Sequence, residues 1–196
     1  MGALNLQFKI LIVGGGTAGC NIAHRFSRIL WKNEIIIIEP SEVLCYQSDF
    51  TFVGAGVRKL RDMIRASVQV LPTNAIWLQD KVVGICPNIN TILTKKEDLV
   101  EYEFMVLALR VVSNFEKVKG LPLALENYRN VCSIYSPKYA EKTFRCLKDF
   151  VKGTAIFTAP RTTTKFLAAS YNVCFIAEDY FKKHGRIARL NRTSLQ

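Results

Sequence analysis

A run of three glycines, placed between an apolar segment and an amphipathic one, constrains this chain more than any other feature of its sequence. Residues 9–13 consist of Lys9 and a continuous apolar run of the kind that forms a parallel strand buried on both faces. After the glycines, apolar side chains recur every four positions over residues 17–30, which predicts a helix. Residues 34–38 predict a second strand, which Pro40 ends. Strand, turn, helix and strand in this order form the βαβ unit of nucleotide-binding folds.

The turn itself satisfies the pattern GxGxxG, with each glycine at a position that has a physical role. Gly14 permits a tight turn, Gly16 lets the backbone approach a pyrophosphate, and Gly19 lets the helix pack closely on the strand. The amides of Thr17 and Ala18 would donate to the phosphates, helped by the positive end of the helix dipole. The sequence therefore predicts a dinucleotide site, and a glycine-rich packing turn is the alternative.

Glu39 strengthens the dinucleotide interpretation because it stands at the end of the second predicted strand, twenty residues beyond Gly19. A carboxylate at this spacing binds the hydroxyl groups of a ribose. The following residues, EPSEV, carry no Arg or Lys that could accept a 2′-phosphate. The residues alone therefore predict FAD or NAD rather than NADP.

The remaining chain predicts an α/β fold with a Rossmann-like parallel sheet and an inserted β-meander. Residues 45–57 carry glycines and aromatics typical of a loop near a ligand or of a helix. The further elements predicted are a basic helix over 58–70, short strands within 74–87 and 91–103, a buried parallel strand over 102–109, a helix over 139–151, a strand over 154–160 and a helix over 168–183.

Composition excludes several classes of protein. The chain has 196 residues, of which 49% are hydrophobic and 22% charged, as in an ordinary globular domain. The sequence contains no run of eighteen apolar residues, so no transmembrane helix is predicted. The first residues are not expected to form a signal or transit peptide. The six cysteines include no CxxC pair and are expected to be reduced structural thiols. With only two histidines, no metal site is expected.

The formal net charge of +11 is concentrated at residues 57–65, 138–148 and 181–196. Such surfaces attract nucleic acids or anionic membranes, and the alternative is a solvated basic surface. No nucleic-acid-binding motif accompanies the charge, so no nucleic-acid partner is expected.

Several segments together carry a resemblance to a known family. These are GGGTAG, IIIIEPSE, FTFVGAG, NAIWLQDKV, YEFMVLAL, FEKVKGLP, AIFTAP and EDYFKK, and they extend through most of the chain. The sequence resembles the FAD-dependent disulfide-reductase superfamily, and within it the mitochondrial sulfide:quinone oxidoreductases. The resemblance chooses FAD over NAD, and it covers only the N-terminal part of the family fold.

The resemblance implies an FAD-binding oxidoreductase that oxidises sulfide at a pair of cysteines and passes electrons to ubiquinone. It implies FAD contacts from Gln47 and from the backbone of Val82, in addition to the residues of the glycine turn and Glu39. It also implies a location on the matrix side of the mitochondrial inner membrane, with a cytoplasmic location open because no transit peptide is visible. Residues 1–120 would form the first FAD-binding region with its β-meander, and residues 121–196 would start a second nucleotide-binding region.

Three departures from the family pattern predict impaired catalysis. Phe166 stands where the family places its first redox cysteine, and a phenyl ring cannot exchange with a thiol. Arg110 replaces a glycine at the end of a strand, and the sequence ends at Gln196, before the family's second redox cysteine. No catalytic residue is therefore assigned. The alternative function is a non-catalytic paralogue or fragment that binds a nucleotide or a partner protein, and self-association stays open.

Overall fold

The computed structural model describes residues 5–160 and 168–195, and the chain divides into two compact units. The first unit contains residues 1–45 and 64–110, and the second contains residues 46–63 and 111–196. Over the residues that the structure describes, no helix is both long and apolar enough to cross a bilayer. The two units are described separately below. The predicted division at residue 120 stays a prediction.

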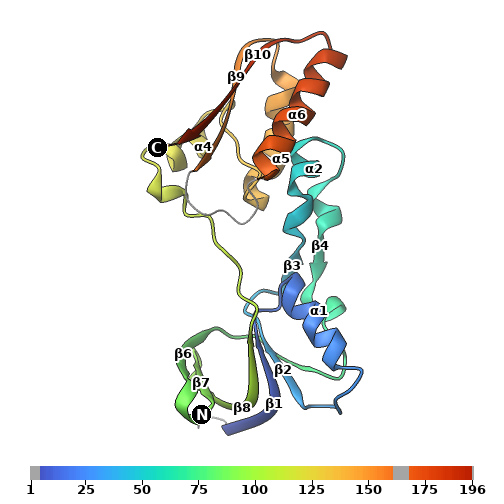
Figure 1. Cartoon of the computed structure of the whole chain (residues 1–196), viewed down its shortest axis with the longest axis vertical. Coiled ribbons are helices and arrows are strands. Elements are labelled where there is room, and N and C mark those ends of the chain that lie inside the picture. Colours follow the sequence, from blue (N-terminus) through green and yellow to red (C-terminus); the bar gives the residue numbers. More distant parts are fainter. Residues whose placement is uncertain (1–4, 161–167, 196) are drawn as a thin grey trace. The chain divides into compact units, whose positions relative to one another are not determined.

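A six-stranded sheet forms the centre of the first unit, in the order β5-β2-β1-β8-β7-β6 (Figure 1). Its strands are β1 (Asn5–Val13), β2 (Ile35–Ile38), β5 (Ile76–Leu78), β6 (Val82–Cys86), β7 (Thr91–Thr94) and β8 (Leu99–Leu107). Strands β5, β2, β1 and β8 run parallel, while β7 and β6 continue the sheet as antiparallel strands. The predicted parallel sheet and β-meander are both confirmed.

Both faces of β2 and of the last residues of β1 are buried, which explains why these segments are continuously apolar. The expectation that the strand over 102–109 is buried in the same way is wrong, because Phe104 and Leu107 of β8 are 68% and 55% exposed. The four isoleucines of β2, residues 35–38, are at most 2% exposed. One face packs Leu11 and Val13 with Ile36 and Ile38. The other packs Ile10 and Ile12 with Ile35, Ile37 and the inner side of α1 (Thr17–Phe26). This burial holds β1 and β2 in register, with Val13 opposite Ile38 at the carboxyl edge.

Short elements complete the first unit. The strands β3 (Val43–Cys45) and β4 (Ile64–Ala66) pair antiparallel, α3 (Ser67–Val70) follows β4, and the 3₁₀ turn η3 (Pro87–Ile89) connects β6 to β7. The expectation of one basic helix over 58–70 is therefore wrong. Residues 64–66 form a strand instead of a helix because they pair with β3, which supplies hydrogen-bond partners for their backbone.

The second unit has a βαβ unit of its own. Strands β9 (Lys152–Pro160) and β10 (Ile187–Leu195) are parallel and α6 (Ala168–Lys183) joins them, as Figure 1 shows at the red end of the chain. The other elements are η1 (Gln47–Asp49), α2 (Phe50–Gly54), η2 (Leu60–Met63), η4 (Phe115–Lys117), α4 (Leu121–Asn127) and α5 (Pro137–Asp149). Leu147 of α5 packs on Ala177 and Phe181 of α6.

The helices predicted over 139–151 and 168–183 and the strand over 154–160 correspond to α5, α6 and β9. Ser136 caps α5 by accepting a hydrogen bond from the Lys138 amide, and Pro137 occupies the first turn. Sequence reasoning treated residues 181–196 as a basic tail and missed β10. The pairing of β10 with β9 supplies the partner that its own sequence does not reveal.

Candidate dinucleotide-binding site

The glycine turn follows β1 at the carboxyl edge of the parallel sheet. The Gly14 amide donates a 2.9 Å hydrogen bond to the carbonyl of Ile38, which joins the turn to the end of β2. Gly14 has φ +105°, and a Cβ placed on it would lie 2.5 Å from the carbonyl oxygen of Ala108. Only glycine fits this position, because both the backbone angle and the neighbouring strand exclude a side chain.

Two more glycines of the motif are required by close packing. A Cβ on Gly19 would lie 1.9 Å from the carbonyl oxygen of Gly14, so the first turn of α1 rests directly on the turn that precedes it. A Cβ on Gly15 would lie 2.8 Å from Cβ of Glu39. Sequence reasoning gave no role to Gly15. The side chain that excludes a Cβ there is that of Glu39, which follows β2 and is distant in sequence.

Gly16 differs from the other three because a Cβ on it would meet no atom within 4 Å. It is the N-cap of α1, provides no side-chain cap, and no acidic residue follows in the first turn. The first intrahelical bond runs from the Cys20 amide to the Gly16 carbonyl, so the earlier amides of Thr17 and Ala18 have no partner within the helix. Thr17 and Ala18 are also exposed. This open, amide-lined helix start suits an anionic phosphate.

Glu39 lies beside the turn, as the spacing predicted. Its Oε2 accepts a 2.8 Å hydrogen bond from the Gly15 amide, and its Oε1 accepts a 2.9 Å bond from the Ser41 amide. The Trp77 indole N–H donates to the Glu39 carbonyl at 2.9 Å and so fixes the backbone at the same residue. Glu39 is half-buried, and each carboxylate oxygen keeps a lone pair available for a hydroxyl donor.

The carboxylate also affects the thiol beneath the turn. Cys20 donates a 3.1 Å hydrogen bond from its Sγ to the Gly15 carbonyl. Burial raises the pKa of the Cys20 thiol, and the nearby Glu39 charge raises the pKa further. Cys20 is therefore a neutral packing residue in the floor of the site.

Six of the predicted binding residues lie together in the first unit. The residues found together at the glycine turn are Gly14, Gly16, Thr17, Ala18, Gly19 and Glu39. Val82 is the first residue of β6, the edge strand of the same sheet. Gln47 belongs to the second unit, where its Nε2 donates to the Tyr135 carbonyl at 3.5 Å. The roles of Val82 and Gln47 stay predictions, and Phe166 lies outside the described residues.

Arg110 follows β8, two residues beyond the Ala108 carbonyl that faces Gly14. Its side chain belongs to an exposed residue and its charge acts on Cys45. Burial raises the pKa of Cys45, and the Arg110 guanidinium partly opposes this rise.

No protein-family model matches the sequence. The mitochondrial sulfide:quinone oxidoreductase of Mus musculus is 35% identical over 185 residues, which are 94% of this chain and 41% of that protein. The chain is a relative of mitochondrial sulfide:quinone oxidoreductase. It spans about two fifths of the length of this curated relative.

Solved structures confirm the predicted fold class. The sulfide:quinone oxidoreductase of Aquifex aeolicus superposes with a TM-score of 0.74 at 19% identity, covering 95% of this chain and 43% of that one. A chain of the Tetrahymena thermophila mitochondrial ATP synthase structure superposes with a TM-score of 0.78 at 19% identity, covering 99% of this chain and 48% of that one. The α/β fold with a mainly parallel sheet is thus that of part of a sulfide:quinone oxidoreductase.

Proposed function

We propose that this chain is an FAD-binding protein of the sulfide:quinone oxidoreductase type. The pyrophosphate would lie on the amides of Thr17 and Ala18, close to the backbone of Gly16, and Glu39 would bind the ribose hydroxyls. The observation that carries the proposal is the open space above Gly16, next to uncapped amides and a carboxylate. The residues fit the cofactor in three respects. The helix amides match the charge of its phosphates, Glu39 matches its ribose hydroxyl groups, and the absence of a side chain at Gly16 leaves space for it.

The resemblance to sulfide:quinone oxidoreductase favours FAD over NAD, which the glycine turn alone leaves open. When bound, the flavin supplies a two-electron acceptor. Val82 and Gln47 are proposed as further contacts. Sulfide, ubiquinone and the mitochondrial inner membrane are proposed partners and location, since the relative's name includes sulfide, quinone and mitochondrial. A basic surface on this chain is compatible with an anionic membrane.

We propose further that sulfide oxidation is impaired at the position of the family's first redox cysteine. Phe166 occupies that position in the sequence. A phenyl ring cannot form a disulfide or hold a persulfide, so sulfide would find no sulfur there to attack. This residue favours the second candidate function, a protein that holds the dinucleotide without turning over sulfide.

The first experiment is an absorbance spectrum of the purified chain after incubation with FAD and gel filtration. We expect retained flavin, and we expect Glu39→Gln to retain less. The substitution turns one of the two accepting oxygens into an NH2 donor, which faces the Gly15 or the Ser41 amide and cannot accept from a ribose hydroxyl. Glu42→Gln is the matched control, because it removes the same charge from an exposed position three residues away. Loss of flavin in both variants, or in the parent, would contradict the proposed site.

The second experiment adds sulfide to the flavin-loaded protein without oxygen. We expect the flavin band to stay oxidised because no cysteine stands at position 166. Restoring the family residue with Phe166→Cys tests whether that position alone limits the reaction. Bleaching of the flavin in the parent chain would show that impairment is wrong and that another thiol carries the reaction.

A further inference from the structure

The loop between α1 and β2, residues 27–34, exposes two large apolar side chains. Trp31 is 81% exposed and Ile29 is 77% exposed, the highest values among the large apolar side chains described in the first unit. Tryptophan is highly buried on average, so such exposure calls for a physical reason. The loop lies at the amino end of β2, whereas the glycine turn lies at the carboxyl end of β1 (Figure 1). A partner on this loop therefore leaves the dinucleotide site free.

Hydrogen bonds tie the loop to the rest of the first unit. The Asn74 side-chain amide donates to the Ser27 carbonyl at 2.9 Å. The Trp31 amide donates to Glu34 Oε2 at 2.7 Å. Leu30 packs on the core cluster formed by β1, β2 and α1. The loop backbone is thus held on the unit, and its exposed apolar side chains do not belong to a frayed helix end.

Three cations lie in the same stretch of chain, and no acidic residue separates them. Arg25, Arg28 and Lys32 are all exposed. None of the three forms an ion pair within the part of the chain that the structure describes. Glu34, the next carboxylate along the chain, accepts from Lys9 Nζ at 2.6 Å. The loop therefore keeps positive charge beside its exposed apolar side chains.

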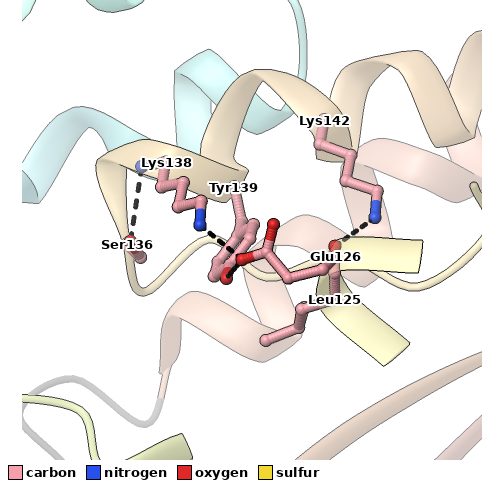
Figure 2. A network of polar contacts seen from close by, with 6 residues as sticks. All are labelled: Leu125, Glu126, Ser136, Lys138, Tyr139 and Lys142. Carbon is pink, nitrogen blue, oxygen red and sulfur yellow. Dashed lines mark hydrogen bonds and ion pairs between the residues drawn. The ribbon is translucent and has the colours of Figure 1, made fainter. Parts of the chain in front are cut away.

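Basic residues of the second unit are engaged by internal contacts instead. Lys138 forms an ion pair with Glu126, whose carboxylate also accepts a 2.5 Å hydrogen bond from the Tyr139 hydroxyl (Figure 2). Lys142 Nζ donates a 2.5 Å hydrogen bond to the Leu125 carbonyl (Figure 2). The last two lysines of α6 form ion pairs with acidic residues one turn earlier. These contacts make those cations less available to an anionic partner than the cations near the α1–β2 loop.

We propose that the α1–β2 loop binds the surface of a bilayer that contains anionic lipids. This inference rests on the membrane location proposed above and names the part of the chain that makes the contact. Trp31 and Ile29 enter the boundary between headgroups and acyl chains, where the indole buries its apolar ring and keeps its N–H near polar groups. The three cations lie among the anionic headgroups, and each strengthens binding about fivefold.

The size and the charge of this surface favour a bilayer over a protein partner. A stable protein interface uses about 20–30 residues on each side, whereas this loop exposes two large apolar side chains. A second copy of this chain would bring another formal charge of +11, and like charges repel. A bilayer needs only a few inserted side chains together with the negative charge of its own lipids.

The test measures co-sedimentation of the full chain with vesicles of phosphatidylcholine and phosphatidylglycerol in equal parts, and with vesicles of phosphatidylcholine alone. We expect binding to the anionic vesicles that weakens with added salt, and little binding to the neutral ones. Trp31→Ala should weaken binding at least about tenfold because the inserted apolar area is lost. Arg28→Gln and Lys32→Gln should each weaken binding about fivefold.

Ile89→Ala and Lys95→Gln are the matched controls for the apolar and the charged substitutions. Ile89 is 70% exposed and Lys95 is exposed, and both belong to the antiparallel side of the sheet, away from β2 in the strand order. Both variants should bind vesicles as the parent does. Circular dichroism shows whether each variant is folded.

Fluorescence gives a second measurement, because the chain has only two tryptophans. Emission from the parent should shift to shorter wavelength when anionic vesicles are added, since the Trp31 indole leaves water. Trp31→Phe should lose this shift while it still binds. Trp77 is not expected to contribute, because its indole already donates to the Glu39 carbonyl at the opposite edge of the sheet.

The outcomes separate this proposal from the others. Vesicle binding that Trp31→Ala and both charge variants leave unchanged would overturn the role of the loop and leave the membrane location standing. A parent that does not bind anionic vesicles would overturn both. Dimers in gel filtration without lipid that Trp31→Ala abolishes would assign the loop to a second copy instead. No step uses FAD, so failure of the dinucleotide site would not alter these results.

Discussion

Alanine substitutions within the glycine turn separate what the fold needs from what a dinucleotide needs. In Gly19→Ala the new Cβ would lie 1.9 Å from the Gly14 carbonyl oxygen, so α1 has to move off the turn. In Gly14→Ala the Cβ would lie 2.5 Å from the Ala108 carbonyl oxygen at φ +105°. For Gly19→Ala, whose φ is not positive, overpacking alone predicts a loss of about 1–3 kcal/mol. For Gly14→Ala, backbone strain of about 1–3 kcal/mol and overpacking of about 1–3 kcal/mol together predict a loss of roughly 2–6 kcal/mol. That is a large part of a domain's stability, about 5–15 kcal/mol.

Gly16→Ala should leave the cofactor-free protein almost unchanged. The new Cβ meets no atom within 4 Å, and φ is −69°, which any residue adopts. Alanine is a poorer N-cap than glycine by roughly 0.5–1 kcal/mol. It gains about 0.4–1 kcal/mol because the unfolded chain has fewer conformations to lose. The two effects offset each other, so the net change should stay within about 0.5 kcal/mol.

The assay is urea unfolding of the cofactor-free variants, followed by titration of each folded variant with FAD. We expect Gly16→Ala to unfold at the parent's urea midpoint and to bind FAD at least about tenfold more weakly, a loss of roughly 1.4 kcal/mol. Gly84→Ala is the control, because its Cβ makes only an ordinary 3.5 Å contact with Leu93. Unchanged FAD affinity in Gly16→Ala would refute the placement of the pyrophosphate.

One further prediction concerns the carboxylate of Asp80, which lies between β5 and β6. Burial alone would raise the pKa of Asp80, but the amides of Lys96 and Lys81 lower it below its usual value. Asp80→Asn turns one acceptor into a donor that faces an amide, so unfolding at neutral pH should cost about 1–3 kcal/mol less. The pKa of Asp80 is lower in the folded chain than in the unfolded chain. The parent's extra stability is therefore present above about pH 4 and is lost as the pH falls through the folded pKa. Urea unfolding at a series of acidic pH values measures this loss.

The sequence predicted the elements whose reasons for folding are local. The strand over residues 9–13, the glycine turn and the strand ending at Ile38 all follow from continuous apolar runs and from GxGxxG. Helix α1 was predicted to reach Leu30 but ends at Phe26. The residues that follow form hydrogen-bonded turns, in which the amides of Arg28 and Ile29 donate to carbonyls three residues earlier. Glu39 was placed correctly because the length of a βαβ unit fixes where its second strand ends.

The features that sequence reasoning missed depend on distant partners. Residues 58–70 carry a helical pattern, yet Ile64–Ala66 pairs with β3 instead. The strand β10 depends on β9, and its own residues are mixed in polarity.

Gly16 shows why the motif taken as a whole is weaker support for a ligand than one of its members. The packing of α1, β8 and Glu39 demands glycine at positions 14, 15 and 19, so a chain that had lost its cofactor would keep these three to stay folded. Nothing in the described structure demands glycine at position 16. Serine or aspartate there would cap α1 and add roughly 1 kcal/mol to its stability. With glycine at this N-cap, α1 is less stable than it would be with a capping side chain. The physical reason we infer for glycine is the space that it leaves for a phosphate on the helix amides.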